Sequence, residues 1–348
     1  MSIVKVQTCR AYEVRIEKGI LRRVGELLGG LQGQPGKIAV ISDEQVWSLH
    51  GAALQSSLHE AGLTGLAYCF APGEASKNLH TVSEILEFLA SKELTRSDLV
   101  LAFGGGVVGD MAGFCAAVYL RGIKYVQIPS SLLAMIDSSV GGKTGVDLAA
   151  GKNLAGAFWQ PEAVYCDPEL LSTLPEEILQ EGMAEAIKYA VISDAQLFEA
   201  LLAWCPQQPL DTIITRCIEI KSRLVCEDEF DRGPRQLLNF GHTIGHAIEK
   251  CSAFSIRHGQ AVAMGMSLMA ELAWRQGWSE IDCSAPIRKA LQQFKLRTQC
   301  PYSYKMLCDS MLRDKKRQGD QINLVIPEKI GRCRLKKVPV SQLSQLFE

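Results

Sequence analysis

The stretch "DLVLAFGGGVVG", Asp98 to Gly109, decides the fold because it joins two kinds of local structure. Its first part is an apolar run that ends in glycines, as expected of a buried strand followed by a tight turn. Gly104 to Gly109 has the pattern G-x-G-x-x-G, in which glycines let backbone amides approach a pyrophosphate at a helix N-terminus. The acidic residue expected roughly 20 positions later is absent. The loop is therefore either a strand–helix turn without a ligand or part of a dinucleotide site, with Asp43 as a candidate for holding the ribose.

Strands and helices alternate through the first half of the chain. Two amphipathic stretches, 44–62 and 79–94, have apolar residues at helical spacing. Further buried strands are predicted on either side of them, at Lys37–Asp43, Leu66–Gly73, Lys124–Ser130 and Ala163–Asp167. This alternation predicts a parallel, doubly wound α/β sheet.

The pattern changes to helices after "DPELLSTLP" (Asp167–Pro175). Helices are predicted within 175–192, 209–229, 239–251, 259–277 and 284–294, and a hairpin within 321–338. We therefore predict a Rossmann-like α/β domain over residues 1–170 and a mainly α-helical domain over 171–348. A ligand in the cleft between them is the default expectation.

Composition limits the classes of function. The chain has 348 residues, and its 37 Lys+Arg against 38 Asp+Glu give no basic excess that would favour nucleic acid. We expect no signal peptide and no membrane span, because no apolar run is long enough. The 12 cysteines form no C-x-x-C pair, which predicts free thiols in a reducing cytoplasm.

A second glycine-rich loop, "DSSVGGKTG" (Asp137–Gly145), resembles a phosphate-binding loop only in part. The Walker pattern needs a glycine where Asp137 stands, and a carboxylate there would repel a triphosphate, so an ATPase or kinase is rejected. Lys143 among glycines, with Lys152 and Asn153 nearby, could still hold a smaller anion. The alternative is a solvated loop without a ligand.

The chain's 6 histidines are unevenly placed, since His242, His246 and His258 fall in one short window. His242 and His246 are four residues apart and share a helix face. Thr243 stands where zinc peptidases of the HExxH type have a glutamate, so a peptidase is unsupported. A metal centre needs a third protein ligand, and either His258 or Glu185 could supply it. The alternative is a polar helix face that binds no metal.

Cationic and amide side chains lie close to these histidines in the sequence. Glu185 and Lys188 are i,i+3 neighbours on one helix face, and Lys221, Arg235 and Asn239 precede His242. A buried site of this composition favours an anionic substrate.

Five segments together resemble the 3-dehydroquinate synthases, a family of the sugar-phosphate cyclase superfamily. They are "GGGVVGDMAGF" (104–114), the run 121–161 from "RGIKY" to "AFWQP", "GMAEAIKYAVI" (182–192), "LLNFGHTIGHAIE" (237–249) and "HGQAVAMGM" (258–266). The likeness extends from about Asp43 to Lys316, with the motifs in order.

The resemblance implies an NAD-binding α/β domain, a helical metal-binding domain and a homodimer. The expected reaction converts a phosphorylated sugar acid, 3-deoxy-D-arabino-heptulosonate 7-phosphate, to 3-dehydroquinate and phosphate, the second step of the shikimate pathway. NAD+ would be used and regenerated in each turnover, and the metal would be zinc or cobalt.

The resemblance also implies a role for individual residues. The metal ligands would be Glu185, His242 and His258, with His246 beside the metal or the substrate rather than a ligand. The cofactor contacts would be Asp43, Gly73, Glu74, Lys77, Gly105, Gly106, Val107, Asp110, Ser130, Ser131, Lys143, Lys152 and Thr173. The substrate-site residues would be Asp137, Lys143, Asn153, Lys188, Lys221, Arg235, Asn239 and His246, with Arg121 reaching the neighbouring subunit's site and Lys315 or Lys316, of which Lys316 is favoured, at the phosphate.

The chain departs from the family pattern at a few positions. Gln260 follows "HG" where an acid is usual, so the surroundings of His258 would differ. Ser130 and Ser131 replace common threonines but keep the hydroxyl groups, and Gln45 replaces a frequent asparagine.

Three other hypotheses are compatible with parts of the pattern. A sister cyclase would act on a sugar phosphate without the carboxylate, whereas Lys143, Lys221, Arg235 and Asn239 favour a carboxylate substrate. A metal-dependent polyol dehydrogenase would lack the phosphate-site residues. A non-catalytic regulator would not need the intact ligands and lysines.

Overall fold

The protein is described here by a computed structural model, which covers residues 1–31, 35–312 and 320–347. Its chain forms two compact units. Unit 1 consists of Met1–Pro175 together with Leu210–Phe230, and unit 2 of Glu176–Pro209 together with Asp231–Glu348. The first crossing between the units lies five residues beyond the predicted boundary at residue 170, and the return of the chain to unit 1 was not predicted.

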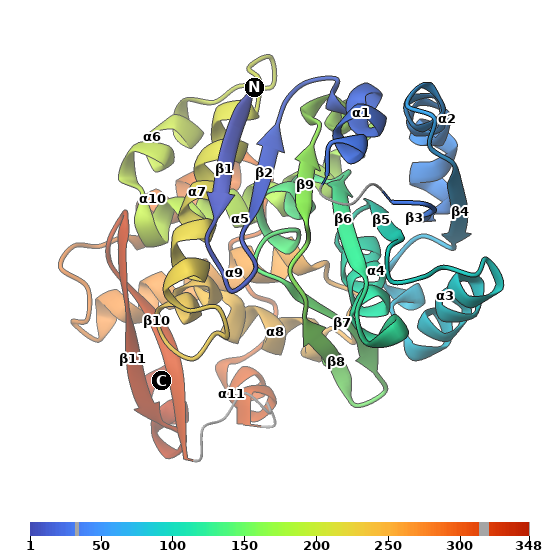
Figure 1. Ribbon diagram of the computed structural model, residues 1–348. Coiled ribbons are helices and arrows are strands. Elements are labelled where there is room, and N and C mark those ends of the chain that lie inside the picture. The colour runs from blue at the N-terminus through green and yellow to red at the C-terminus, as the bar shows by residue number, and fades with distance from the viewer. Residues whose placement is uncertain (32–34, 313–319, 348) are drawn as a thin grey trace. The chain divides into compact units, whose positions relative to one another are not determined.

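Unit 1 is built on a seven-stranded sheet, counted over the described residues, with the order β1-β2-β9-β6-β5-β3-β4. Figure 1 shows these strands side by side. Only β1 and β2 pair antiparallel, and each of the other neighbouring pairs is parallel. The strands are β1 (Ser2–Val6), β2 (Tyr12–Ile16), β3 (Ile38–Asp43), β4 (Gly65–Phe70), β5 (Leu99–Gly104), β6 (Lys124–Pro129) and β9 (Ala163–Cys166). The predicted α/β fold with a mainly parallel sheet is confirmed, and β1 and β2 are additions to it.

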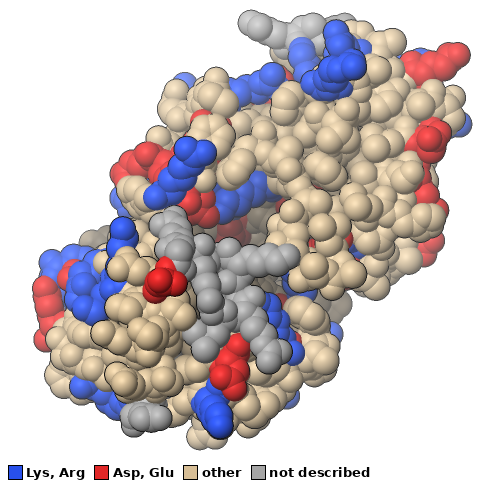
Figure 2. All heavy atoms as spheres, turned by 90° about the horizontal axis from the view of Figure 1, so that it is seen from below, with Lys and Arg blue, Asp and Glu red and all other residues tan. Residues whose placement is uncertain are grey.

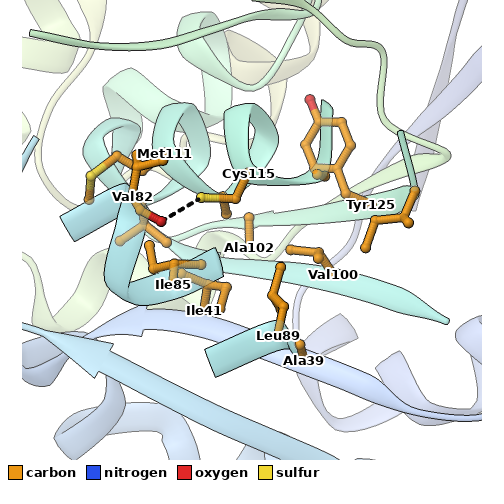
Figure 3. Close-up of a cluster of buried hydrophobic side chains, with 14 of the residues drawn as sticks. Ala39, Ile41, Val82, Ile85, Leu89, Val100, Ala102, Met111, Cys115 and Tyr125 are labelled. Atoms are coloured by element: carbon orange, nitrogen blue, oxygen red, sulfur yellow. Dashed lines mark hydrogen bonds between the residues drawn. The ribbon is translucent and has the colours of Figure 1, made fainter. Parts of the chain in front are cut away.

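The parallel strands form because their residues are apolar without interruption, as expected where both faces of a sheet are covered. All six residues of β5 are buried. Side chains from β3 and β5 meet the helices α3 (Leu79–Ser91) and α4 (Gly106–Val118) in one apolar cluster. Figure 3 shows Ile41 and Ala102 from the strands facing Ile85 from α3 and Met111 from α4. This packing holds the loop between β5 and α4 in place.

The remaining elements of unit 1 connect or cover the sheet. The helices are η1 (Ile20–Arg23), α1 (Val24–Gly29), α2 (Glu44–Glu60), η2 (Glu74–Ser76), η3 (Tyr119–Arg121), η4 (Ala134–Ser138), η5 (Pro168–Thr173) and α7 (Asp211–Glu227). A separate hairpin consists of β7 (Lys143–Leu148) and β8 (Gly151–Phe158). Part of the stretch considered as a flexible anion loop is thus the first strand of a hairpin.

Helix α7 lies in unit 1, whereas the predicted division placed its residues in the second domain. Its sequence is helical, as predicted, but it packs against β1 and η4 of unit 1 rather than joining the helices of unit 2. Ser222 donates a hydrogen bond to the carbonyl of Lys5 at 3.0 Å, which ties α7 to the edge strand. Helical periodicity reveals an apolar face but not which neighbour covers it.

Unit 2 is mainly helical, as predicted. Its central helix, α9 (His258–Arg275), packs against α5, α8 and α10. The other elements are α5 (Glu176–Ser193), α6 (Ala195–Ala203), η6 (Pro234–Asn239), α8 (His242–Cys251), α10 (Ser284–Gln293), α11 (Tyr304–Leu312), η7 (Val340–Gln342), α12 (Leu343–Phe347) and the hairpin of β10 (Gln321–Lys329) and β11 (Arg332–Pro339). The predicted hairpin is confirmed as β10–β11.

Surface charge is mixed. The face drawn in Figure 2 carries separate groups of Lys and Arg and of Asp and Glu, in keeping with the formal net charge of -1. Over the part of the chain that the structure describes, no helix is both long enough and apolar enough to cross a membrane.

Candidate functional site

Glu185 lies in the most deeply buried part of α5. Every residue from Gly182 to Ile192 is buried, and the side chains of Glu185 and Lys188 are only 1% and 2% exposed. The two side chains form an ion pair one helical turn apart. Burial of a charged pair is costly unless both members are held by partners, so their place in the core of unit 2 needs a functional or structural reason.

Glycines bring α5, α8 and α9 unusually close together. A Cβ at Gly259 would meet Glu181 Cα at 2.4 Å, and one at Gly265 would meet the carbonyl oxygen of Gly241 at 2.1 Å. Real side chains do not tolerate such distances, so only glycine lets the three helix backbones approach to this extent. The approach places the first residues of α8 and α9, His242 and His258, beside Glu185 of α5.

Glu185, His242 and His258 form a group whose ligand atoms all lie within 4.8 Å of one another. Glu185 Oε1 is 3.5 Å from His242 Nε2 and 3.6 Å from His258 Nε2. Glu185 Oε2 pairs with the ammonium of Lys188, so Oε1 is the oxygen that faces the two rings. A buried carboxylate that faces two imidazole nitrogens fits a divalent cation.

The orientation of His242 supports the same interpretation. Its Nδ1 lies 3.1 Å from the carbonyl oxygen of Phe240. A carbonyl can only accept, so Nδ1 is the donor in this contact, which leaves Nε2, the nitrogen that faces Glu185, as the one suited to bind a metal. Metal-bound histidines are commonly held by such a bond from the other ring nitrogen.

His246 belongs to a different group, with Glu249 and His258, rather than to the group around Glu185. Its ring centroid lies 5.5 Å from that of His242 and 6.0 Å from that of His258. The arrangement therefore favours one ligand and one neighbouring histidine on α8 over the simple pair of ligands considered from the spacing alone.

The carboxylates around His258 change its protonation. Burial lowers the pKa of His258, but its contacts with Glu185 and Glu249 outweigh burial and raise the pKa to about 10. Two carboxylates thus stabilise positive charge at this ring. A divalent cation would compete for the same place with the proton on Nε2, because a ligating imidazole nitrogen has to be deprotonated.

Arg235 and Asn239 lie in η6 of unit 2, just before α8. Arg235 is 2% exposed, one of the largest fully buried side chains of the described residues. Asn239 Nδ2 donates to the carbonyl of Gln236 at 3.1 Å, and Gln236 Oε1 accepts from Asn323 Nδ2 of β10 at 2.7 Å. The β10–β11 hairpin thereby supports the segment that carries Arg235. Lys315 and Lys316 lie outside the described residues.

Lys77 of unit 1 lies at the centre of a second cluster. Its Nζ is 2.7 Å from Asp110 Oδ2 and 2.6 Å from Asn153 Oδ1. Lys152 Nζ is 3.9 Å from Glu74 Oε1 beside them. Burial lowers the pKa of Lys77, but the carboxylates of Asp110 and Glu74 outweigh it and raise the pKa above its usual value. The structure thus brings together four predicted cofactor contacts and the substrate-site residue Asn153.

Most of the other predicted cofactor contacts of unit 1 lie at the carboxyl ends of neighbouring parallel strands, where open α/β sheets bind ligands. Ser130 N donates to the carbonyl of Gly104 at 2.9 Å, which joins the ends of β6 and β5. Asp43 ends β3 and caps α2, accepting from Val46 N at 2.9 Å. The remaining residues of this edge are Gly73 after β4, Gly105, Gly106 and Val107 at the start of α4, and Ser131 after β6.

Thr173 lies elsewhere in unit 1, at the end of η5. Its hydroxyl is 2.8 Å from His50 Nε2 of α2. This contact joins α2, whose first turn is capped by Asp43, to the last residue of η5.

Lys221 of α7 forms an ion pair with Asp137 of η4, and its ammonium also donates to the carbonyl of Asp137. Two predicted substrate-site residues thus lie in contact within unit 1, far apart in sequence. Lys143, at the start of β7, and Arg121, in η3, are both exposed. Arg121 has a left-handed backbone with φ of 65°.

Sequence reasoning missed Glu249. It is 2% exposed, and Oε2 lies 3.5 Å from His258 Nδ1. Its spacing could have indicated it, because Glu249 is seven residues after His242 and three after His246 on α8 and so shares their face.

Family profiles and curated relatives agree on one family. The profile described as 3-dehydroquinate synthase N-terminal matches residues 67–181, and the profile 3-dehydroquinate synthase C-terminal matches residues 182–317. The 3-dehydroquinate synthase of Streptococcus suis (strain 05ZYH33) is 42% identical over 344 residues, 97% of each chain. That of Enterococcus faecalis (strain ATCC 47077 / OG1RF) is 41% identical over 99% of this chain and 97% of its own.

Solved structures share the fold over nearly the whole chain. A 2-deoxy-scyllo-inosose synthase in complex with carbaglucose-6-phosphate, NAD+ and Co2+ has a TM-score of 0.89 at 24% identity, covering 99% of both chains. A 2-epi-5-epi-valiolone synthase from Streptomyces hygroscopicus subsp. jinggangensis 5008, with NAD+ and Zn2+ bound, has a TM-score of 0.87 at 25% identity, covering 99% of this chain and 97% of its own. An iron-containing alcohol dehydrogenase is more distant, with a TM-score of 0.67 at 15% identity. Sequence identity over almost the entire length shows that the chain belongs to the 3-dehydroquinate synthase family.

Proposed function

We propose that this protein is a 3-dehydroquinate synthase, a carbon–oxygen lyase that converts 3-deoxy-D-arabino-heptulosonate 7-phosphate to 3-dehydroquinate and phosphate. One observation carries the proposal: Glu185, His242 and His258 gather their ligand atoms within 4.8 Å, in a chain that is 42% identical to a 3-dehydroquinate synthase over 97% of its length. The reaction would be the second step of the shikimate pathway, which leads to aromatic amino acids.

Glu185, His242 and His258 would hold the cation, Zn2+ or Co2+. Three protein ligands leave coordination positions for the substrate, and the buried carboxylate of Glu185, which faces both imidazoles, fits the role of a ligand. The related cyclase structures with Co2+ or Zn2+ support the choice of metals.

NAD+ would be bound by unit 1. The strand ends at Asp43, Gly105 and Ser130 would hold the nucleotide, with the first turn of α4 presenting its amides to the pyrophosphate. The other proposed contacts are Gly73, Glu74, Lys77, Gly106, Val107, Asp110, Ser131, Lys143, Lys152 and Thr173. When both groups are bound, NAD+ accepts and returns a hydride and the cation acidifies the substrate hydroxyl that is oxidised.

The remaining residues would bind an anionic substrate that carries a carboxylate and a phosphate. Ammonium and guanidinium groups suit both anions, and Lys188 and Arg235 have the burial that strengthens such contacts. The proposed set is Asp137, Lys143, Asn153, Lys188, Lys221, Arg235, Asn239 and His246, with Arg121 and with Lys315 or Lys316 at the phosphate.

These residues would hold one substrate through several steps. Oxidation of a hydroxyl acidifies the adjacent C–H, so phosphate can leave by elimination and take the proton with its own oxygen. The ketone is then reduced, the ring opens, and an intramolecular aldol reaction closes the carbocycle. The chain's contribution is to keep the reactant oriented in a cationic site.

We also propose that the enzyme is cytoplasmic and works as a homodimer. All 12 cysteines are free thiols, which suits a reducing compartment. In a homodimer the exposed Arg121 would reach the neighbouring subunit's site.

The test is turnover of the purified protein with heptulosonate phosphate and catalytic amounts of NAD+ and Zn2+ or Co2+. Phosphate and 3-dehydroquinate are expected in equal amounts, without accumulation of NADH. Sustained NADH accumulation would instead indicate a polyol dehydrogenase. Turnover only with a sugar phosphate that lacks the carboxylate would indicate a sister cyclase.

A further inference from the structure

We propose that Glu249 is a positioning residue that holds His258 in the orientation required for metal binding. The inference rests on the proposed metal centre and adds a residue to it. Glu249 is not among the residues that the family resemblance assigned, and the chain has Gln260 where the family usually has an acid near this histidine.

The His258 ring lies between two carboxylates, one at each nitrogen. Nε2 faces Glu185 Oε1 at 3.6 Å, and Nδ1 faces Glu249 Oε2 at 3.5 Å. If Nε2 binds the cation, Nδ1 has to carry the ring's proton, and a carboxylate is the strongest neutral-pH acceptor for it. Glu249 therefore selects the tautomer that leaves Nε2 free, as the carbonyl of Phe240 does for His242.

The position of Glu249 is itself held by packing, so its carboxylate can orient the His258 ring. Its side chain is 3% exposed, and it lies in the last turns of α8, whose close packing on α9 depends on Gly245 and Gly265. A Cβ at Gly245 would meet Val262 Cα at 3.1 Å, which shows how closely the two helix backbones approach. The carboxylate and the ring are thus held by the same helix pair.

Gln260 does not perform this role. Its Oε1 accepts a hydrogen bond from the backbone amide of Arg297 at 2.8 Å, so its side chain supports the segment after α10. The acid at position 249 accordingly supplies the contact to the ring, whatever residue stands at 260.

The experiment measures the affinity of the purified protein for Zn2+ by competition with a chromophoric chelator. Glu249→Gln keeps the shape and hydrogen-bonding capacity but removes the charge, and it is expected to raise the Kd for Zn2+ about 10- to 100-fold. Glu181→Gln is the matched control, since Glu181 is also a carboxylate near His258 but pairs with Arg257 at 3.8 Å. The control is expected to change the Kd less than about threefold, because Glu181 pairs with the half-exposed Arg257 and such pairs contribute little.

Equal losses of Zn2+ affinity in Glu249→Gln and Glu181→Gln would overturn the proposal, because the removal of one negative charge near His258 would then explain both losses. So would an unchanged Kd in Glu249→Gln. His246→Ala separates the remaining alternative: a loss of affinity as large as in Glu249→Gln would place the metal in the group His246, Glu249 and His258, with Glu249 a ligand. Because the readout is metal binding, an absence of dehydroquinate formation in the wild type would refute the proposed function without touching this inference.

A second measurement needs no variant and so does not depend on folding of Glu249→Gln. In the Zn2+-loaded wild type labelled with 15N-histidine, two-bond proton–nitrogen correlations report the tautomer of each ring. A protonated Nδ1 on His258 is expected, and a protonated Nε2 would overturn the proposal.

Discussion

Gly259 at the start of α9 lies directly against the backbone of Glu181 on α5, where a Cβ would meet Glu181 Cα at 2.4 Å. Gly259 follows His258, and Glu181 lies one helical turn before Glu185. The contact therefore sets how closely two of the proposed ligands approach, although neither Gly259 nor Glu181 is itself one of them.

Gly259→Ala is expected to separate these ligands and weaken metal binding at least tenfold. Overpacking of this kind costs about 1–3 kcal/mol, and backbone rather than a flexible side chain has to move. Chelator competition gives the Kd for Zn2+, and urea unfolding gives the stability. Gly29→Ala is the control, because a Cβ at Gly29 meets nothing within 4 Å. Metal binding by Gly259→Ala at wild-type affinity would show that the contact does not set the ligand geometry.

Removal of the metal is expected to lower the thermal stability of the protein. A ligand present at 100 times its Kd stabilises the folded state by about 2.7 kcal/mol, so EDTA should lower the Tm and added Zn2+ should restore it. Calorimetry with and without metal measures the shift. Glu185→Gln should be inactive and show no metal-dependent change in Tm, since the carboxylate that faces both imidazoles is lost. If Glu185→Gln showed a metal-dependent change in Tm as large as that of the wild type, Glu185 would not be a metal ligand.

Most of the fold could be predicted from local patterns. The parallel strands are uninterrupted apolar runs, and β5 leads into α4 through glycines, so both periodicity and turn chemistry point the same way. Strands β1 and β2 were missed because "SIVKV" and "YEVRI" are short and alternate with charged residues. The assignment of α7 to unit 1 depends on what covers its apolar face, which no single segment encodes.

The residues of the candidate site also divide into those that local sequence reveals and those that only the fold brings together. His242, His246 and His258 stand out because they are near one another in sequence, whereas Lys77 with Asp110 and Lys221 with Asp137 meet only through the fold. Lys77 and Asp110 were named from the resemblance, and although Lys221 and Asp137 were noted from the sequence, nothing in their spacing predicted that they would pair. Glu249 was missed although its spacing places it on the helix face of His242 and His246, because the sequence does not show whether an acid is buried.

Lys77→Met is expected to weaken NAD+ binding and to destabilise unit 1. The substitution leaves the carboxylate of Asp110, whose pKa burial already raises, without the ammonium that is 2.7 Å away. Lys77→Met combined with Asp110→Asn should recover part of the loss, with a coupling of about 0.5–3 kcal/mol between the two sites. Urea unfolding of the single and double variants measures the coupling, and fluorescence titration measures the affinity for NAD+.

Lys37→Met serves as the control for loss of a lysine, since Lys37 pairs with Glu93 at 3.8 Å on the surface and such pairs contribute little. Additive effects of the Lys77 and Asp110 substitutions would contradict the proposed coupling. Unchanged affinity for NAD+ in Lys77→Met would show that the cluster around Lys77 is not part of the cofactor site.

His50 is expected to make part of the stability depend on pH. Burial lowers the pKa of His50, an effect that Asp167 partly opposes. Because the folded-state pKa lies below that of the unfolded chain, the unfolded state binds the proton more readily, and this contribution is present above about pH 6.5 and is lost as the pH falls through the folded-state pKa. His50→Gln, which keeps a polar group near Thr173 Oγ1, should therefore lose less stability than the wild type between pH 8 and pH 5, as thermal unfolding at the two pH values would show. Identical decreases in stability in the two proteins would mean that His50 does not titrate with folding. His80→Gln, at an exposed histidine, controls for the loss of a histidine, and its stability should decrease as much as that of the wild type.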